Sequence, residues 1–260
     1  HGIYGNESFF KMKIRVIFYK TANKLLVYER RAKRLLVKEG INEDKLVVIY
    51  NSLNYDLHLK IRKKLDNKVI SNRFNFFENN ALPYLIFVGR LTEVKKNDML
   101  IDAVARINKT QYRVNLLFIG EGVMKVKLQN KINNLNLNNK VHFYGACYKE
   151  EELANFIYSS SLCVSPGNIG LTAVHSMSFG TPVCTHSNFL NQMPEVEIIE
   201  EGVNGCFFEE NNIGSLVNVI TNWVESEIDR ELVRTNCYKV IDELYNPYAQ
   251  VQIMKQLVQD

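Results

Sequence analysis

Two cationic residues follow an apolar segment in the middle of the chain. Arg90 comes after the run Tyr84–Val88 and one glycine, and Lys95 lies five residues further on. Later, Gly170 precedes a segment with helical periodicity that begins near Leu171. The first amides of a helix lack partners within the helix, and the helix dipole is positive there, so such an end binds anions. Together these residues predict a diphosphate site.

Glycines recur where four apolar runs end, and glycine lets a ligand approach the backbone closely. For any single run the alternative is an ordinary strand-to-helix turn, and for Arg90 and Lys95 it is ordinary surface charge. Because four ends share the feature, we expect a ligand-binding rim. The glycines are Gly89, Gly120, Gly122, Gly145, Gly167 and Gly170.

The elements that must position these residues alternate regularly from residue 83. Apolar runs of strand length are followed by amphipathic helices, which predicts an α/β fold with a mostly parallel, doubly wound sheet covered on both faces. Ligands bind beyond the carboxyl ends of such strands, where the glycines lie. The expected strands are 84–88, 114–119, 141–144, 162–164 and 182–185, and the expected helices are 97–107, 123–135, 149–159 and 171–179.

The two ends of the chain differ from this pattern. Residues 10–50 read as helix, strand, helix and strand, and residues 53–80, rich in Lys, Asn and Asp, predict a helix and a linker. Helices are expected over 213–223, 230–245 and 249–258, with Pro247 breaking the chain before the last of them. We therefore divide the chain into residues 1–80, 81–235 and 236–260.

Composition limits the classes of protein. The 260 residues are 46% hydrophobic, yet no apolar run reaches the roughly 20 residues of a transmembrane helix. The net charge of +4 is too low by itself for a nucleic-acid binder, and we expect no nucleic-acid partner. The basic N-terminal region could attract an anionic membrane surface, although a solvated helix surface is the commoner origin of such charge.

The cysteines bear on the cellular compartment. There are five, and none forms a Cys-x-x-Cys pair, which disfavours a zinc ribbon. Buried free thiols in a reducing compartment are the simplest interpretation, so we expect a cytoplasmic protein, with peripheral contact at the inner membrane face as an open possibility. The chain has no initiating Met, and we interpret it as part of a longer product.

Several segments resemble glycosyltransferase family 4, in the family's order. The resemblance covers about residues 83–225, while residues 1–54 resemble the end of the family's first domain. It implies two Rossmann-like domains that face a cleft, the GT-B type, with the first domain incomplete. Residues 1–80 would end the acceptor-side domain and form the linker, residues 81–235 would bind the nucleotide-sugar donor, and residues 236–260 would form C-terminal helices. The segments are Val88–Lys96, Phe118–Gly122, His142–Gly145, Ser165–Leu171, Ser176–Val183 and Glu201–Phe208.

The resemblance implies a retaining glycosyltransferase. It would move a sugar from a nucleotide diphosphate, with UDP or GDP expected, to a glycan or lipid-linked acceptor in surface polysaccharide or lipopolysaccharide synthesis. Arg90 and Lys95 would stabilise the leaving diphosphate electrostatically, and neither a cofactor nor a metal would be needed. The donor-binding positions that the resemblance implies are Gly89, Gly120, Gly122, Tyr148, Gly167, Asn168, Gly170, Leu171, Thr172 and His175.

The sequence departs from the family where many members carry two glutamates. Gly167 and His175 occupy these positions. A neutral imidazole at His175 can accept from one ribose hydroxyl and donate to another, and the alternative is a buried structural histidine. His1 and the residues after it resemble a first-domain loop in which a histidine contacts the donor sugar, so His1 is a catalytic candidate. A frayed terminus is its alternative.

Two other functions remain open. A nucleotide-sugar epimerase can share this architecture, but it would usually need carboxylates in the cleft, which the aligned positions lack. A non-catalytic nucleotide-binding module is the second, because the first domain is incomplete. For the chain as it stands we expect nucleotide binding without efficient transfer.

Overall fold

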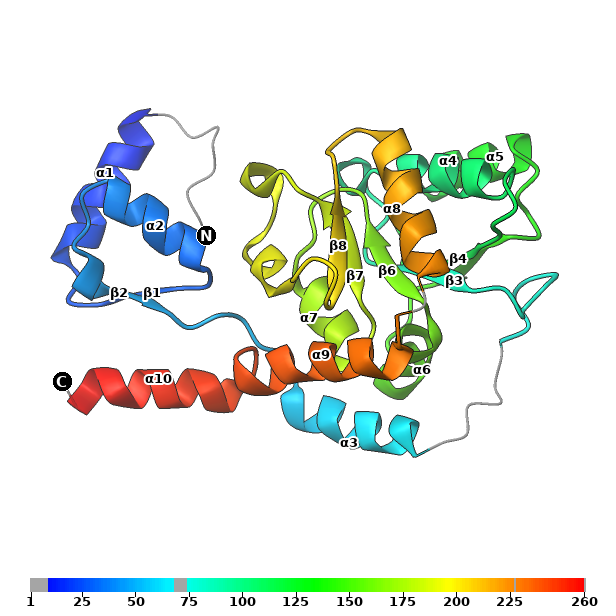
Figure 1. Ribbon diagram of the computed structural model, residues 1–260. Coiled ribbons are helices and arrows are strands. Elements are labelled where there is room, and N and C mark those ends of the chain that lie inside the picture. Colours follow the sequence, from blue (N-terminus) through cyan, green and yellow to red (C-terminus); the bar gives the residue numbers. More distant parts are fainter. Residues whose placement is uncertain (1–8, 68–73, 227, 260) are drawn as a thin grey trace.

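The computed structural model describes residues 9–67, 74–226 and 228–259. These residues form two units, a smaller amino-terminal one and a larger one (Figure 1). The predicted helix, strand, helix, strand order of the smaller unit is confirmed, and its two strands pair in parallel. Its elements are α1 (Phe9–Thr21), β1 (Leu25–Val27), α2 (Arg30–Lys38), the short 3-10 helix η1 (Glu43–Lys45) and β2 (Leu46–Val48).

The larger unit contains a six-stranded sheet in which every neighbouring pair is parallel, with the order β5-β4-β3-β6-β7-β8. The predicted parallel α/β fold is therefore confirmed. The chain moves outward in one direction from β3 and in the other from β6, so the loops after these two strands diverge at the switch point where ligands bind in such sheets. The strands are β3 (Tyr84–Val88), β4 (Asn115–Ile119), β5 (Val141–Gly145), β6 (Leu162–Ser165), β7 (Val183–His186) and β8 (Gly205–Phe208).

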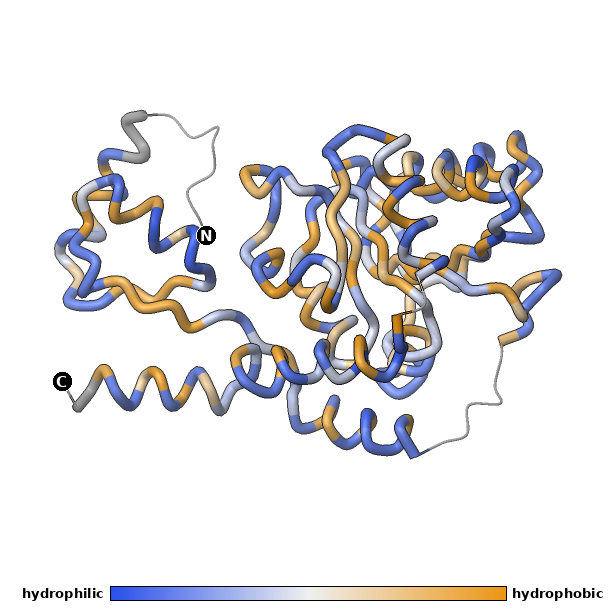
Figure 2. Tube along the Cα trace, in the orientation of Figure 1, coloured by the Kyte–Doolittle hydropathy of each residue, from blue (hydrophilic) through white to orange (hydrophobic). Residues whose placement is uncertain are grey.

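Helices cover both faces of this sheet, and neighbouring residues of one strand enter different cores. Leu85 and Phe87 pack with α4, α5 and α8, whereas Ile86 packs with α6, α7 and α9. The hydrophobic strands therefore lie inside two layers of helices whose outer sides are more hydrophilic (Figure 2). The helices are α3 (Tyr55–Asp66), α4 (Asn97–Ile107), α5 (Lys125–Asn134), α6 (Glu150–Ser159), α7 (Leu171–Ser178), α8 (Ile213–Glu225), α9 (Arg230–Glu243) and α10 (Pro247–Gln259), with 3-10 helices η2 (Glu93–Lys95), η3 (Phe189–Asn191) and η4 (Pro194–Ile198).

The last helices differ in detail from the prediction. Pro247 does not break the chain before the last helix; it is the first residue of α10, where its missing N–H costs no hydrogen bond. The division proposed after residue 235 falls inside the continuous helix α9. From the larger unit, α10 extends toward the smaller one (Figure 1), and Gln250 donates a hydrogen bond to the carbonyl of Tyr50 at 2.8 Å.

The smaller unit has a small core. Only Leu36, Ile41 and Leu46 form its buried cluster among the described residues. On α1, Ile14, Ile17 and Phe18 expose 66–74% of their surface. Within the described ranges, no helix is both long enough and apolar enough to cross a membrane. The five cysteines are unpaired, and all but Cys147 are buried, which confirms the expectation of free thiols.

Candidate nucleotide-sugar site

The loops after β3, β4 and β6 pack against one another at the carboxyl edge of the sheet. A Cβ atom at Gly120 would lie 1.9 Å from the carbonyl oxygen of Gly89, and one at Gly167 would lie 2.0 Å from that of Val94. At Gly122 the corresponding distance to the Leu91 oxygen is 2.3 Å. Close backbone packing thus accounts for these glycines, and ligand contact at them stays a prediction.

Lys95 joins the loops after β3 and β6. Its Nζ donates to the Asn168 carbonyl at 2.7 Å and to Asn168 Oδ1 at 2.8 Å, while the Gly167 amide donates to the Lys95 carbonyl at 3.1 Å. Burial, and then the nearby charge of Arg90, lower the pKa of Lys95. Arg90 itself is exposed. The structure therefore brings the two predicted cations together beside the start of α7.

The first turn of α7 is held against its surroundings. Gly170 is the N-cap and makes no side-chain capping bond, while Thr172 Oγ1 donates to the Val88 carbonyl at 3.2 Å. Leu171 remains 42% exposed. The second carboxylate oxygen of buried Glu195 has no partner and would lie 3.8 Å from a Cβ at Gly170. An anion at this helix start would meet that negative charge, so it would need the positive charges of Arg90 and Lys95.

His175 lies in a cluster with Glu150 and His58. Its Nε2 is 2.6 Å from Glu150 Oε1, and His58 Nε2 is 3.0 Å from the same oxygen. The two imidazole rings stack with centroids 5.1 Å apart. The bonds from His175 and His58 hold the pKa of Glu150 well below its usual range. The cluster ties α3 to α6 and α7, a structural role compatible with a ribose contact by the remaining edge of His175.

The same three side chains are the one group among the described residues whose potential ligand atoms, all within 4.8 Å, could hold a metal ion. Two imidazole nitrogens and a carboxylate oxygen suit Zn²⁺. However, the buried Nδ1 of His58 has no partner. A metal-bound imidazole normally donates from its other nitrogen, so the Nε2–H tautomer that donates to Glu150 fits His58 better.

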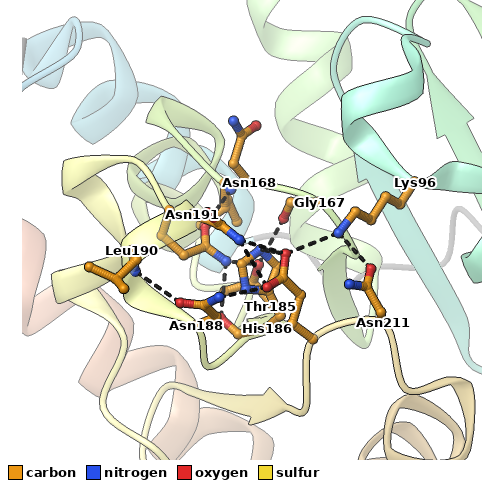
Figure 3. Close-up of polar contacts among 12 residues, drawn as sticks. Lys96, Gly167, Asn168, Thr185, His186, Asn188, Leu190, Asn191 and Asn211 are labelled. Carbon is orange, nitrogen blue, oxygen red and sulfur yellow. Dashed lines mark hydrogen bonds and ion pairs between the residues drawn. The ribbon is translucent and has the colours of Figure 1, made fainter. Parts of the chain in front are cut away.

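Several functional candidates were missed by the sequence reasoning. One is Glu195, whose Oε1 accepts a hydrogen bond from Asn51 of the segment between the units. Others are His186, the last residue of β7, and Glu210, which follows β8; both belong to one polar network, part of which is drawn in Figure 3. Polar residues directly after the apolar run of β7 were the signal that could have located this network, because ligands bind beyond strand ends.

Two predicted positions stand apart from these clusters. Tyr148 is 94% exposed, on the loop between β5 and α6. His1 lies outside the described residues. A donor contact at either residue stays a prediction.

The sequence matches a known family over most of its length. The profile of the family described as "Glycosyl transferases group 1" matches residues 69–240. An uncharacterized 41.2 kDa protein in the cps region of Klebsiella pneumoniae is 26% identical over 227 residues, which are 83% of this chain and 57% of that protein. An uncharacterized glycosyltransferase of Methanocaldococcus jannaschii is 29% identical over 171 residues, 64% of this chain and 40% of that protein. The chain thus spans about half the length of these relatives.

Solved structures share the fold at low sequence identity. Anabaena HepE, solved in complex with UDP, superposes with a TM-score of 0.72 at 20% identity, over 98% of this chain and 68% of that one. Sucrose-phosphate synthase from Thermosynechococcus elongatus gives a TM-score of 0.73 at 18% identity, over 98% of this chain and 62% of that one. The family profile covers well over half of the chain, and the chain therefore belongs to the glycosyl transferases group 1 family.

Proposed function

We propose that this protein transfers a sugar, with retention at the anomeric carbon, from a nucleotide diphosphate to a glycan or lipid-linked acceptor. The finer assignment to glycosyltransferase family 4, the role in surface polysaccharide or lipopolysaccharide synthesis and the cytoplasmic location belong to the same proposal. UDP and GDP are the donors to test first, since HepE was solved with UDP and one relative is named a GDP-mannose-dependent mannosyltransferase. No cofactor or metal has a part in the proposed reaction.

The observation that carries the proposal is the position of two cations beside an uncapped helix start. Lys95 reaches Asn168, two residues before Gly170, and Arg90 lies close enough to Lys95 to lower its pKa. Fixed cations and free amides at one point can stabilise the charge that develops on a leaving diphosphate. The alternative of an epimerase is not favoured, because the matching family and the named relatives are glycosyltransferases.

The test compares diphosphates with nucleosides. Arg90→Ala should raise the Kd of UDP or GDP far more than that of uridine or guanosine, measured by titration calorimetry. In a full-length enzyme, it should cost about 2–4 kcal/mol of transition-state stabilisation, the scale of one lost electrostatic donor. Arg113→Ala is the matched control, because Arg113 is exposed at the opposite end of the sheet, before β4. Equal weakening of nucleosides and diphosphates would remove Arg90 from the phosphate role.

A further inference from the structure

A pocket opens beside the candidate diphosphate site. It has a volume of about 510 Å³ and lies between the loops that follow β3, β6, β7 and β8. The walls include Lys96, Asn168, His186, Leu190, Asn191 and Glu210 (Figure 3). It adjoins the diphosphate site at Asn168, which lines the pocket and also accepts hydrogen bonds from Lys95. Its position at the carboxyl edge of the sheet and its size are those of small-molecule sites.

Charges within the pocket are paired. Glu210 accepts hydrogen bonds from Asn188 at 2.7 Å, from Asn191 at 3.0 Å and from Lys96 at 3.0 Å, and Lys96 also reaches Asn211 at 2.7 Å. Burial is the largest single influence on the pKa of Glu210 and raises it, but these bonds together lower it to about 2. The carboxylate is therefore charged and already surrounded by donors, so neither a free anion nor a cation is favoured.

His186 adds unused hydrogen-bonding capacity to the pocket. It is 1% exposed, its Nδ1 has no partner, and burial lowers its pKa, so the ring is neutral. Because an unpaired buried N–H is rarer than an unpaired acceptor, Nε2 carries the proton. This nitrogen lies 3.9 Å from Glu210 Oε1, too far for a direct hydrogen bond. One hydroxyl placed between them could accept from His186 and donate to Glu210.

The rim of the pocket is apolar. Leu190 and Val94 line it with 62% and 55% of their surfaces exposed, and Met193 lies with them. A pyranose ring presents both features that these walls complement, namely hydroxyl groups and a C–H face. We propose that this pocket binds an uncharged pyranose unit, one hydroxyl of which bridges His186 and Glu210. The inference deepens the proposed function and rests on it, since the unit would belong either to the nucleotide sugar or to the acceptor.

The experiment has two arms that distinguish these sources. In the first, calorimetry compares UDP with UDP-glucose and UDP-N-acetylglucosamine, and GDP with GDP-mannose. In the second, saturation-transfer NMR detects methyl α-pyranosides of glucose, mannose and N-acetylglucosamine, with and without UDP. Both arms use the full chain as wild type, Glu210→Gln and Leu190→Ala, with Glu209→Gln as the matched control. Glu209 is the exposed neighbour; its carboxylate accepts from Asn212, and its amide donates to Ser215 in the first turn of α8.

We expect the wild type either to bind at least one nucleotide sugar more tightly than the corresponding nucleotide, or to bind at least one methyl pyranoside. This sugar-dependent binding is the gain that the variants should reduce. Glu210→Gln should reduce that gain about tenfold, the scale of one charged hydrogen bond, and Leu190→Ala about threefold. If the variants lose the extra affinity for nucleotide sugars in calorimetry, the pocket holds the donor sugar. If they lose the binding of methyl pyranosides in NMR, the pocket holds the acceptor. The proposal is overturned if no sugar adds to binding, or if both variants stay within twofold of wild type. If no nucleotide binds, the proposed function fails instead, and the nucleotide-free pyranosides still decide the pocket.

Discussion

The smaller and larger units of this chain both alternate strands with helices, but they bury different amounts of apolar surface. In the larger unit each of six strands lies between two layers of helices, and residues such as Leu85, Phe87 and Phe118 are at most 1% exposed. In the smaller unit two strands support a buried cluster of three residues, and α1 leaves Ile14 and Phe18 largely exposed.

This difference separates a unit that is held together by its own core from one that depends on contacts with the rest of the chain. A parallel sheet is stable when both faces are covered, and only the larger one meets that condition among the described residues. The smaller unit meets the larger one through a few polar contacts and through Val48 and Tyr50, which pack against the larger core. Glu197 accepts from two amides of α2, and Gln250 accepts from Ser52 at 2.9 Å. The position of the smaller unit therefore depends on a few contacts that mutation can remove.

The largest expected effect is the loss of stability caused by a cavity in the core of the larger unit. Phe118 packs against Phe143 and Phe87 with ring centroids 4.9 and 5.7 Å away. Phe118→Ala should cost about 3–5 kcal/mol of global stability, measured by urea unfolding. Leu46→Ala in the smaller core should cost about 2 kcal/mol, visible as faster amide exchange confined to residues 25–48. An equal loss of global stability in both variants would contradict the difference between the units.

Most of this contrast could be predicted from the sequence. Strands buried on both faces read as apolar runs, so β3 was predicted with its exact bounds and β4 within one residue. The helix over 97–107 was predicted correctly because its apolar residues follow one periodicity. Pro247 was misread because proline can either end a helix or begin one, and local sequence does not separate the two cases.

A smaller effect is expected at the cluster that ties α3 to the larger unit. Glu150→Gln keeps an oxygen acceptor for His58 and His175 but removes the charge, so it should cost about 1–2 kcal/mol at pH 7. The folded-state pKa of Glu150 lies below its ordinary value of 4.5. The carboxylate therefore contributes fully above pH 4.5, and its contribution is lost as the pH falls toward the folded pKa.

Urea unfolding between pH 7 and pH 3 measures this dependence. The stability difference between wild type and Glu150→Gln should shrink as the pH falls below about 4.5. Glu151→Gln is the matched control, because its exposed pair with Lys64 should contribute less than about 1 kcal/mol. A difference that persists unchanged at pH 3 would show that the charge of Glu150 does not carry the effect.

The candidate site was predictable only where its residues follow a predicted strand or begin a predicted helix. Arg90, Lys95 and the start of α7 follow from glycine and charge spacing next to predicted strands. In contrast, Asn51 and Glu195 are 144 positions apart, and nothing local to either residue indicates that they meet. Their contact arises because the segment between the units meets the start of η4, a result of the tertiary fold rather than of any motif.

The smallest expected effect is at the junction itself, where Glu197 replaces a missing helix cap. Glu29, at the N-cap of α2, makes no side-chain capping bond. Instead, the two oxygens of Glu197 accept from the amides of Arg30 and Arg31, each at 2.7 Å. Glu197→Gln leaves one oxygen for two amides and removes a negative charge from a helix start, which should cost about 0.5–1 kcal/mol.

This contact joins the two units, but only the smaller unit should become less protected when it is lost. Hydrogen exchange should become several-fold faster at the amides of α2 and at β1 and β2, while α7 and the six-stranded sheet keep their wild-type protection. Glu200→Gln provides the control, since Glu200 is exposed three residues later on the same unit. Faster exchange spread evenly over both units would mean that the smaller unit is as firmly built into the fold as the larger one. Unchanged exchange in α2 would show that Glu197 adds nothing to the junction, leaving Gln250 and the segment around Tyr50 to hold the smaller unit in place.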